Sequence, residues 1–402
     1  MSYLIELSPG SMPLGWVLQI LTFQVFGYSI VVARLPSAVA SVISCICLLS
    51  IARRMHLRIP WLAAVVFALL PLQFRYALEG RPYALGVMFS LLATWFFLRL
   101  AQQSRVSDVL GYSISVAAGL YTQPLSIFVA IGHLIWTASH GVGGRLKLAF
   151  TIAGSLALAV LACAPWYLCV RSTWAHTIST TDVSFNPEWK TPLLLLREIS
   201  GAGYIGSALL ILFVFAAVWA GRPTKRASRL LLLLVIVPAG GALCMDVAFG
   251  YFVAIRQMIY ILPALALLAA EGIATLYDRS RIAGRILASL LIVVFLEYDH
   301  RWLTRPREDW AAAAQSLLEQ TTVQGACLVF VPSDSAKYYR FFRPSLQGAA
   351  CSTDDLRSAA VIIRAVSPYP TGFDDGQAQV AIAGRRRVRH LNVGGTVIEQ
   401  YR

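Results

Sequence analysis

Long apolar runs separated by short polar loops dominate the first three quarters of the chain. The runs that are candidates for membrane helices are residues 36–52, 60–77, 82–101, 108–121, 124–138, 147–169, 202–220, 229–247, 257–275 and 284–298. A perpendicular helix needs about 20 residues to cross the hydrocarbon core, and several of these runs are shorter, so their bounds are approximate. The pattern predicts an all-α polytopic membrane domain of about ten to eleven helices over residues 1–298.

Two stretches of this domain leave alternatives open. Residues 108–138 form either one kinked helix or a tight hairpin that is broken at Gln123-Pro124. Residues 12–33 carry no charge and are long enough to span, but they also contain proline and glycine. They therefore either cross the membrane or lie along its outer interface. Arg34 lies outside in both cases, so the later topology does not depend on this choice.

The basic residues of the loops decide between the two readings of residues 108–138. If this stretch is a hairpin, one set of loops holds Arg53, Arg54, Arg58, Arg105, Arg145, Lys147, Arg222, Lys225, Arg226, Arg229, Arg279, Arg281 and Arg285. The opposite loops hold Arg34, Arg75, Arg81, Arg171, Lys190, Arg197 and Arg256. Cytoplasmic loops collect Lys and Arg, so the larger set is expected to be cytoplasmic. A single helix would destroy this bias, and the hairpin is therefore favoured.

The segment from Arg75 to Tyr83 lies between two apolar runs and should emerge on the outer face. Its sequence is Arg-Tyr-Ala-Leu-Glu-Gly-Arg-Pro-Tyr. Burial of one charged residue at mid-membrane costs about 2.5–3.5 kcal/mol on insertion scales, so its charged residues are not expected to face lipid. Gly80 permits a sharp turn, and Pro82 can open the next helix. We interpret the segment as one wall of a polar active site.

The character of the sequence changes after residue 298. The expected elements are a helix at 309–320 and strands at 326–331, 360–366 and 396–401. They predict a small α/β domain over residues 299–402, in the periplasm. Cys327 and Cys351 could form a disulfide bond in that oxidising compartment. The basic run at 385–387 is expected to be a solvated edge or turn, with contact to anionic head groups as the alternative.

Composition narrows the class of protein. Hydrophobic residues make up 57% of the chain, charged residues make up 13%, and the mean hydropathy is +0.66. A soluble protein contains about 25% charged residues. The net charge is +14, and the basic residues that produce it lie in short loops between apolar runs. This distribution is typical of membrane topology, so no nucleic-acid partner is expected. The cysteines show no spacing that is typical of a zinc site.

Several short motifs occur in a fixed order along the chain. They are Phe26-Gly27-Tyr28-Ser29, Ala33-Arg34-Leu35-Pro36-Ser37, the segment Tyr76 to Tyr83, Gly119-Leu120-Tyr121-Thr122, Ala164-Pro165-Trp166, Arg256-Gln257 and Glu308-Asp309-Trp310. Together they resemble the bacterial C-type membrane glycosyltransferases of the protein-O-mannosyltransferase-like group. This group includes the aminoarabinose transferase of lipid A and the galacturonic acid transferases of rhizobial lipopolysaccharide. The resemblance covers nearly the whole chain.

The resemblance implies transfer of a sugar from a polyprenyl-phosphate donor to a lipid, glycan or protein acceptor, at the periplasmic face of the bacterial inner membrane. Arginine binds phosphate bidentately, so Arg75, Arg81 and Arg256 are candidates for the donor phosphate. Glu79 is the candidate base for the acceptor hydroxyl. Alternatively, Arg75 and Glu79 form a structural i,i+4 pair, and the other two arginines anchor helices at the interface.

Further candidates complete the expected site. Tyr83, Gln257 and His176 are candidates for substrate contacts. Whether the site also uses a divalent metal ion stays open. Relatives carry an acidic residue early in the first external loop, as base or metal contact. Here only Glu6 precedes residues 12–33, and its surroundings do not match the Asp-Glu motif of the relatives. Glu6 is the second catalytic candidate. We expect that either the chain starts downstream of the true first helix or the protein lacks the usual base.

Two other classes of function compete with a glycosyltransferase. One is a transporter or lipid flippase, but its polar groups would be expected at mid-membrane, whereas those of this chain cluster at the outer face. The other is an inactive glycosyltransferase-like scaffold that lacks the acid of the first loop.

Overall fold

The structure, a computed structural model, describes residues 12–103, 105–139, 145–180, 191–221, 224–249, 255–304, 309–321, 326–331, 335–347, 359–366 and 382–402. The chain forms two compact units, Met1–Leu303 and Thr304–Arg402. Each unit has its own fold and its own hydrophobic core.

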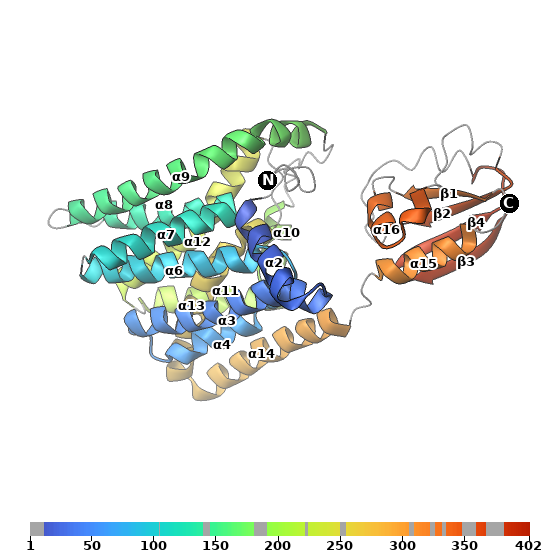
Figure 1. Ribbon diagram of the computed structural model, residues 1–402. Coiled ribbons are helices and arrows are strands. Elements are labelled where there is room, and N and C mark those ends of the chain that lie inside the picture. Colours follow the sequence, from blue (N-terminus) through green and yellow to red (C-terminus); the bar gives the residue numbers. More distant parts are fainter. Residues whose placement is uncertain are drawn as a thin grey trace. The chain divides into compact units, whose positions relative to one another are not determined.

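The first unit is a bundle of helices (Figure 1). Its elements are α2 (Pro13–Phe26), α3 (Ile30–Arg54), α4 (Pro60–Leu69), α5 (Pro71–Ala77), α6 (Tyr83–Gln102), α7 (Val106–Thr122), η1 (Pro124–Ser126), α8 (Ile127–Ala138), α9 (Arg145–Thr180), α10 (Thr191–Glu198), α11 (Gly203–Trp219), α12 (Lys225–Phe249), η2 (Ile255–Ile261), α13 (Leu262–Arg279) and α14 (Arg281–Thr304). Each apolar run predicted as a span coincides, to within one residue at either end, with all or part of one of these helices or of two consecutive ones.

Length and composition identify part of this set as candidate membrane spans. Within the described residues, 5 helical stretches are long and apolar enough to cross a membrane, and the bent pair α4–α5 would make a sixth. The 5 are Ile30–Arg54, Tyr83–Gln102, Leu146–Arg171, Lys225–Met245 and Ile255–Arg279. The total of about ten to eleven spans stays a prediction.

Residues 106–138 form a hairpin. α7 ends at Thr122, and Gln123 has an extended backbone with φ −158° and ψ 116°. The Tyr112 hydroxyl lies 3.3 Å from Nδ1 of His133 on α8. These two residues lie at similar distances on either side of the break, so only antiparallel helices can bring them together. The hairpin favoured by loop charge is confirmed, and the alternative of one kinked helix is wrong.

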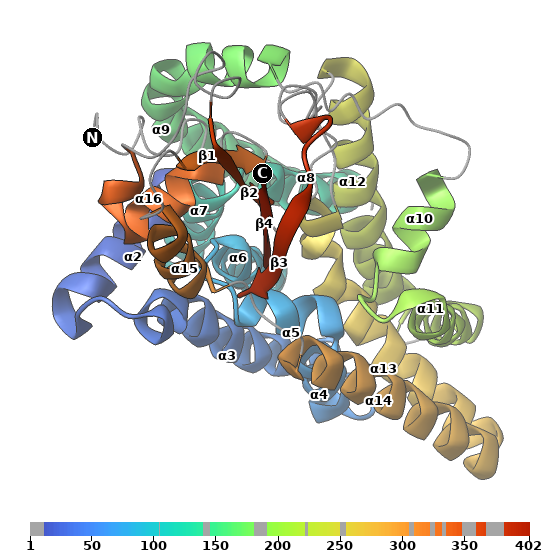
Figure 2. The ribbon, with the colours of Figure 1, turned by 90° about the vertical axis from the view of Figure 1, so that its right-hand side faces the viewer.

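The alternation of the helices collects their ends into two groups. At one end, Oγ of Ser37 on α3 donates a hydrogen bond to the carbonyl oxygen of Arg81 at 2.9 Å. At the other end, Arg54 donates to the side chain of Gln102 at 2.8 Å. Figure 2 views the bundle from the first end, which carries α2, α5 and α10. The two groups match the two sets of loops expected from the sequence. Which side of the membrane each faces stays a prediction.

The apolar run at 60–77 is broken into α4 and α5, which are bent by 69° relative to each other. Pro71 begins α5, and proline disfavours helical backbone at the residue before it. Leu70 accordingly adopts φ −68° and ψ 113°. The backbone N–H of Leu72 donates to the carbonyl oxygen of Ser200 at 3.2 Å, which ties α5 to the turn before α11.

Helix α2 packs against the segment between α5 and α6. A Cβ added at Gly15 would lie 2.6 Å from Cβ of Pro82, so only glycine fits there without a shift. Gly27 ends the helix with φ 78°. The 14 residues of α2 extend for about 21 Å, which is shorter than the ~30 Å hydrocarbon core. This length favours the interfacial alternative for the N-terminal stretch over a span.

The second unit holds a four-stranded sheet in the order β1-β2-β4-β3, with β1 parallel to β2 and the other pairs antiparallel. Its elements are α15 (Trp310–Thr321), β1 (Ala326–Val331), α16 (Ala336–Phe342), η4 (Pro344–Gln347), β2 (Val361–Val366), β3 (Arg387–Val393) and β4 (Thr396–Tyr401). Asp309 begins α15, because its Oδ1 accepts the backbone N–H of Ala312 at 2.9 Å. The sequence predicted α15, β1, β2 and β4, but it did not predict α16 or β3.

Glu399 on β4 links the neighbouring strands β2 and β3 through its side chain. Its carboxylate accepts hydrogen bonds from Arg364 at 2.8 Å, Arg387 at 2.9 Å and the Tyr401 hydroxyl at 3.0 Å. Burial raises the pKa of Glu399, but these hydrogen bonds outweigh burial and hold its pKa below the usual value. The basic run at 385–387 leads into the edge strand β3, as expected for a solvated edge.

Cys327 on β1 is disulfide-bonded. Cys351, with which the sequence paired it, lies outside the described residues.

Candidate active site

Helix α3 holds the segment between α5 and α6 at two points. The hydroxyl of Ser37 donates a hydrogen bond to the carbonyl oxygen of Arg81, which fixes the backbone of the segment there. A Cβ at Gly80 would lie 3.1 Å from the carbonyl oxygen of Ala33, so the close approach of α3 favours glycine there. Pro82 is the residue before α6, which begins at Tyr83. The sequence analysis expected Pro82 at the first position of this helix. Pro82 instead directly precedes α6, as its N-cap residue.

Glu79 lies between two guanidinium groups. Nε of Arg75 donates to Oε1 of Glu79 at 3.1 Å, and Nε of Arg81 lies 3.9 Å from Oε2. The side chain of Glu79 is 21% exposed, whereas Arg75 is 44% and Arg81 is 58% exposed. The i,i+4 pair expected as the structural alternative is therefore present. Arg81 is the more open of the two cations.

Aromatic rings surround the Arg75 side of this cluster. The guanidinium carbon of Arg75 lies 4.3 Å from the ring centroid of Trp302 on α14 and 5.7 Å from that of Tyr76. Both are within range of a cation–π attraction. The rings of Tyr76 and Tyr83 meet edge-on, with centroids 4.8 Å apart. Tyr83 thus helps to fix the ring of Tyr76 beside Arg75.

Helix η2 brings Arg256 and Gln257 to the same end of the bundle. Arg256 interacts electrostatically with the Tyr76 side chain, as do Arg75 and Glu79. η2 also packs closely on α6, because a Cβ at Gly86 would lie 2.7 Å from the Tyr260 hydroxyl. Residues more than 170 positions apart in the sequence therefore share one electrostatic environment. Gln257 is partly buried beside them.

Two of the predicted site residues are not placed with this cluster. Glu6 lies outside the described residues. His176 belongs to α9, but its side chain is also outside the described part of the structure. Their roles stay predictions.

Trp302 belongs to this region, and the sequence did not point to it or to the buried Asp299 on the same helix. Both lie on α14, which continues to Thr304, whereas the apolar run ends at 298. The signal that was available is the spacing of Asp299 and Trp302, which places both on one helical face. Apolar content alone gave no reason to extend the helix that far.

The described residues of the cluster offer few ligands for a metal ion. No group of three or more His, Cys, Asp or Glu side chains that could hold a metal ion occurs within the described ranges. The cluster has one carboxylate, and two guanidinium groups flank it. A divalent cation prefers several oxygen ligands, so these described side chains do not fit one.

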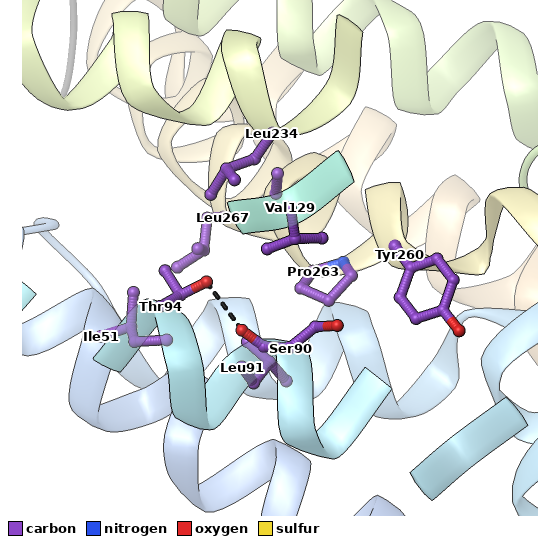
Figure 3. A pocket seen from close by; sticks show the side chains of 10 residues that line it. Ile51, Ser90, Leu91, Thr94, Val129, Leu234, Tyr260, Pro263 and Leu267 are labelled. Atoms are coloured by element: carbon purple, nitrogen blue, oxygen red, sulfur yellow. Dashed lines mark hydrogen bonds between the residues drawn. The ribbon is translucent and has the colours of Figure 1, made fainter. Parts of the chain in front are cut away.

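A small cavity lies deeper in the bundle (Figure 3). It is lined by Ile51, Ser90, Leu91, Thr94, Val129, Leu234, Tyr260, Pro263, Ala264 and Leu267. Its volume of ≈ 20 Å³ suits a single water molecule. Thr94 Oγ1 donates to the carbonyl oxygen of Ser90 at 2.8 Å, which the dashed line in Figure 3 marks. This cavity is far too small for an isoprenoid chain.

Known proteins share this arrangement of helices. The family model described as dolichyl-phosphate-mannose-protein mannosyltransferase matches residues 10–168, which include the segment Arg75–Tyr83. The crystal structure of ArnT from Cupriavidus metallidurans in the apo state covers 98% of this chain, and the match covers 88% of that chain. The TM-score is 0.53 at 13% sequence identity.

The chain has the fold of a C-type membrane glycosyltransferase. ArnT from the same organism bound to undecaprenyl phosphate matches this glycosyltransferase fold with TM-score 0.53 and 14% identity, over 96% of this chain and 87% of that one. The oligosaccharyltransferase of Archaeoglobus fulgidus in the apo form matches with TM-score 0.50 and 12% identity, over 76% of this chain and 49% of that one. A sequence search found no curated protein that matches the chain.

The resemblance expected from the sequence motifs is therefore confirmed. At these identities the solved structures establish the fold, and the roles of individual residues stay predictions. The fold together with the long apolar helices makes the chain a membrane protein.

Proposed function

We propose that the protein transfers a sugar from a polyprenyl-phosphate donor to a lipid, glycan or protein acceptor. The observation that carries this proposal is the cluster of Glu79 with Arg75 and Arg81, beside Arg256, at one end of an apolar helix bundle. The binding of undecaprenyl phosphate by ArnT, which has the same fold, supports this choice of donor. The inner membrane is the proposed location, with the cluster on its periplasmic face.

The arginines of the cluster suit the leaving phosphate. As the bond between the anomeric carbon and the phosphate oxygen breaks, negative charge grows on the phosphate. Arg81 is the most exposed of the cluster's measured side chains and can offer two parallel N–H donors to that charge. Arg256 adds a second cation from η2. Such preorganised donors stabilise charge that develops in the transition state.

Glu79 is the proposed base. The acceptor hydroxyl oxygen forms the new bond to the anomeric carbon, and its proton passes to the carboxylate. Oε1 of Glu79 already accepts a hydrogen bond from Arg75, whereas Oε2 lies 3.9 Å from Arg81. Oε2 is therefore the oxygen proposed to take the proton. Tyr83, Gln257 and His176 are proposed substrate contacts, and Glu6 is proposed as a second carboxylate near the acceptor.

The test is transfer from a polyprenyl-phosphate-linked sugar by the full chain in detergent, with products detected by mass. We expect Arg81→Ala to lower kcat by about 10²–10³-fold, as for loss of one charge-stabilising donor. Arg301→Ala is the matched control. Arg301 also pairs with a glutamate four residues away, at 2.6 Å, but outside the cluster. Turnover by Arg81→Ala that equals that of the control would remove the phosphate role.

Sugar transfer, measured together with donor binding, separates an enzyme from an inactive relative. A folded chain that binds polyprenyl phosphate but transfers no sugar from any donor offered would be a scaffold of the glycosyltransferase type. Substrate uptake into proteoliposomes would identify a transporter instead.

A further inference from the structure

Helix α16 of the second unit carries large aromatic side chains on its exposed side. Among the described residues of this unit, the exposed large hydrophobic side chains are Tyr338, Phe341, Phe342 and Val388. Phe341 is 81% exposed, Tyr338 is 46% exposed and Phe342 is 40% exposed, and these three form the aromatic face of α16. Single exposed hydrophobic residues are normal, whereas a group of them marks a contact surface.

The opposite side of α16 fixes the helix to the sheet. Tyr339 is fully buried, its hydroxyl lies 3.1 Å from Oγ1 of Thr396, and its ring stacks on that of Phe330 with centroids 5.2 Å apart. α16 also lies beside α15 (Figure 1). Positions 338, 341 and 342 have the i, i+3, i+4 spacing of one helical side. The packing of Tyr339 therefore holds the aromatic face outward.

Positive charge accompanies the aromatic face. Residues 335–347 contain three basic residues and no acidic one. Arg343, directly after α16, is exposed, and its Nε donates to Gln315 at 2.9 Å while its Nη1 donates to the carbonyl oxygen of Phe342 at 3.2 Å. Its Nη2 has no hydrogen-bond partner among the described residues. Aromatic rings beside basic side chains are typical of surfaces that lie in the interface of an anionic membrane.

The chain itself supplies a membrane within reach of the second unit. α14 ends at Thr304, and α15 follows after Asp309. Five Cα-to-Cα steps join these two residues, and they span at most about 18 Å. Such a short tether to a membrane-embedded unit gives the second unit a high effective concentration of lipid. A small surface can therefore hold lipid here, although it would bind vesicles weakly on its own.

We propose that the aromatic face of α16 binds the membrane in which the first unit is embedded. The rings of Phe341, Phe342 and Tyr338 enter the boundary between head groups and acyl chains, and Arg343 meets the phosphates of anionic lipids. The partner is thus a lipid surface that carries negative charge. This contact does not depend on the proposed function, because it requires no sugar donor and no turnover.

Photocrosslinking of the full chain in lipid nanodiscs tests this contact. The nanodiscs contain phosphatidylcholine and phosphatidylglycerol, and p-benzoylphenylalanine replaces Phe341. The matched control carries the same replacement at Val388, which is 47% exposed on β3 of the same unit. Mass spectrometry after irradiation should detect lipid adducts at position 341 and none above background at position 388. If the chain does not fold with the replacement at Phe341, the replacement at Phe342 takes its place.

The charge of the lipid and of Arg343 provides the second arm of the test. Arg343→Gln should lower the yield of lipid adducts by up to about fivefold, as for loss of one cation at an anionic surface. Arg389→Gln on β3 should leave the yield unchanged, and nanodiscs of phosphatidylcholine alone should lower it as Arg343→Gln does. Equal lipid yields at positions 341 and 388, or no adducts at all, would overturn the proposal. Adducts of position 341 with this chain or a second copy would also overturn it, because the aromatic face would then pack on protein.

Discussion

Replacement of Gly15 by Ala should displace the candidate site, although Gly15 lies on α2 and is not one of the candidate site residues. Gly15 is buried on α2, where an added Cβ would lie 2.6 Å from Cβ of Pro82 and 3.4 Å from its Cγ. Carbon atoms in contact normally stand about 3.5–4.0 Å apart, so α2 or the segment beneath it must move by about 1 Å. Arg81 directly precedes Pro82, so its guanidinium group should move with the segment.

The expected effect on activity is larger than the effect on stability. Overpacking costs about 1–3 kcal/mol, while Ala gains up to about 1 kcal/mol over Gly in a helix. The free energy of unfolding should therefore fall by no more than about 3 kcal/mol. A misplacement of about 1 Å at a catalytic group can lower the rate about 10²-fold. We expect a loss of kcat of that order in a chain that is still folded.

Gly240→Ala is the matched control for this substitution. Gly240 lies on α12, and a Cβ added there would meet nothing within 4 Å. Its Tm should stay or rise, and its turnover should match the wild type. Sugar transfer and thermal unfolding are measured on both variants. Equal turnover by Gly15→Ala and Gly240→Ala would refute the claim that α2 positions the site. Addition of Pro82→Gly should return part of the activity lost in Gly15→Ala.

Three further predictions test the fold and the cluster. Gly272→Ala on α13 should prevent normal folding, because the added methyl group would collide with the backbone of α11; a normal yield and Tm would contradict this packing. The pKa of Glu399 is held below its ordinary value of 4.5, so its contribution to stability is complete above that pH and is lost as the pH falls through its lower, folded value. Glu399→Gln should therefore flatten the acid dependence of hydrogen exchange in β4, and an unchanged pH profile would argue against the pairing with Arg364. Glu79→Gln should lower kcat by about 10²–10⁴-fold, the range of general-base catalysis, and more than Arg75→Ala does; equal losses would indicate a structural ion pair.

The helices were predictable because of what lipid demands of a backbone. Each span must satisfy its own N–H and C=O groups, so long apolar runs read directly as helices. The hairpin at 106–138 was predictable from loop charge, since only that reading kept the basic residues on one side. The break at Leu70-Pro71 was missed, because the sequence stays apolar across Pro71. Proline nevertheless disfavours helical backbone at the residue before it, so one helix does not continue through this point.

The candidate site was predictable only in part. The segment Arg75–Tyr83 concentrates charges that lipid would exclude, and this local signal identified Glu79 and its flanking arginines. Trp302 was missed, because its role comes from α14 passing α5. Such a contact depends on tertiary packing, which no local pattern encodes. The pairing of Arg387 with Glu399 was missed for the same reason, since β3 was not predicted.

The bend between α4 and α5 explains how these distant residues meet. A straight continuation of α4 would carry Arg75 about 7.5 Å beyond the break, at 1.5 Å per residue. The bend of 69° divides that path into about 2.7 Å along the α4 axis and about 7 Å across it. Arg75 therefore stays at the level of the bundle end and moves sideways, where Trp302 of α14 lies within 4.3 Å of it. The proline that interrupts the apolar run is thus part of how the chain brings its carboxylate and its arginines together.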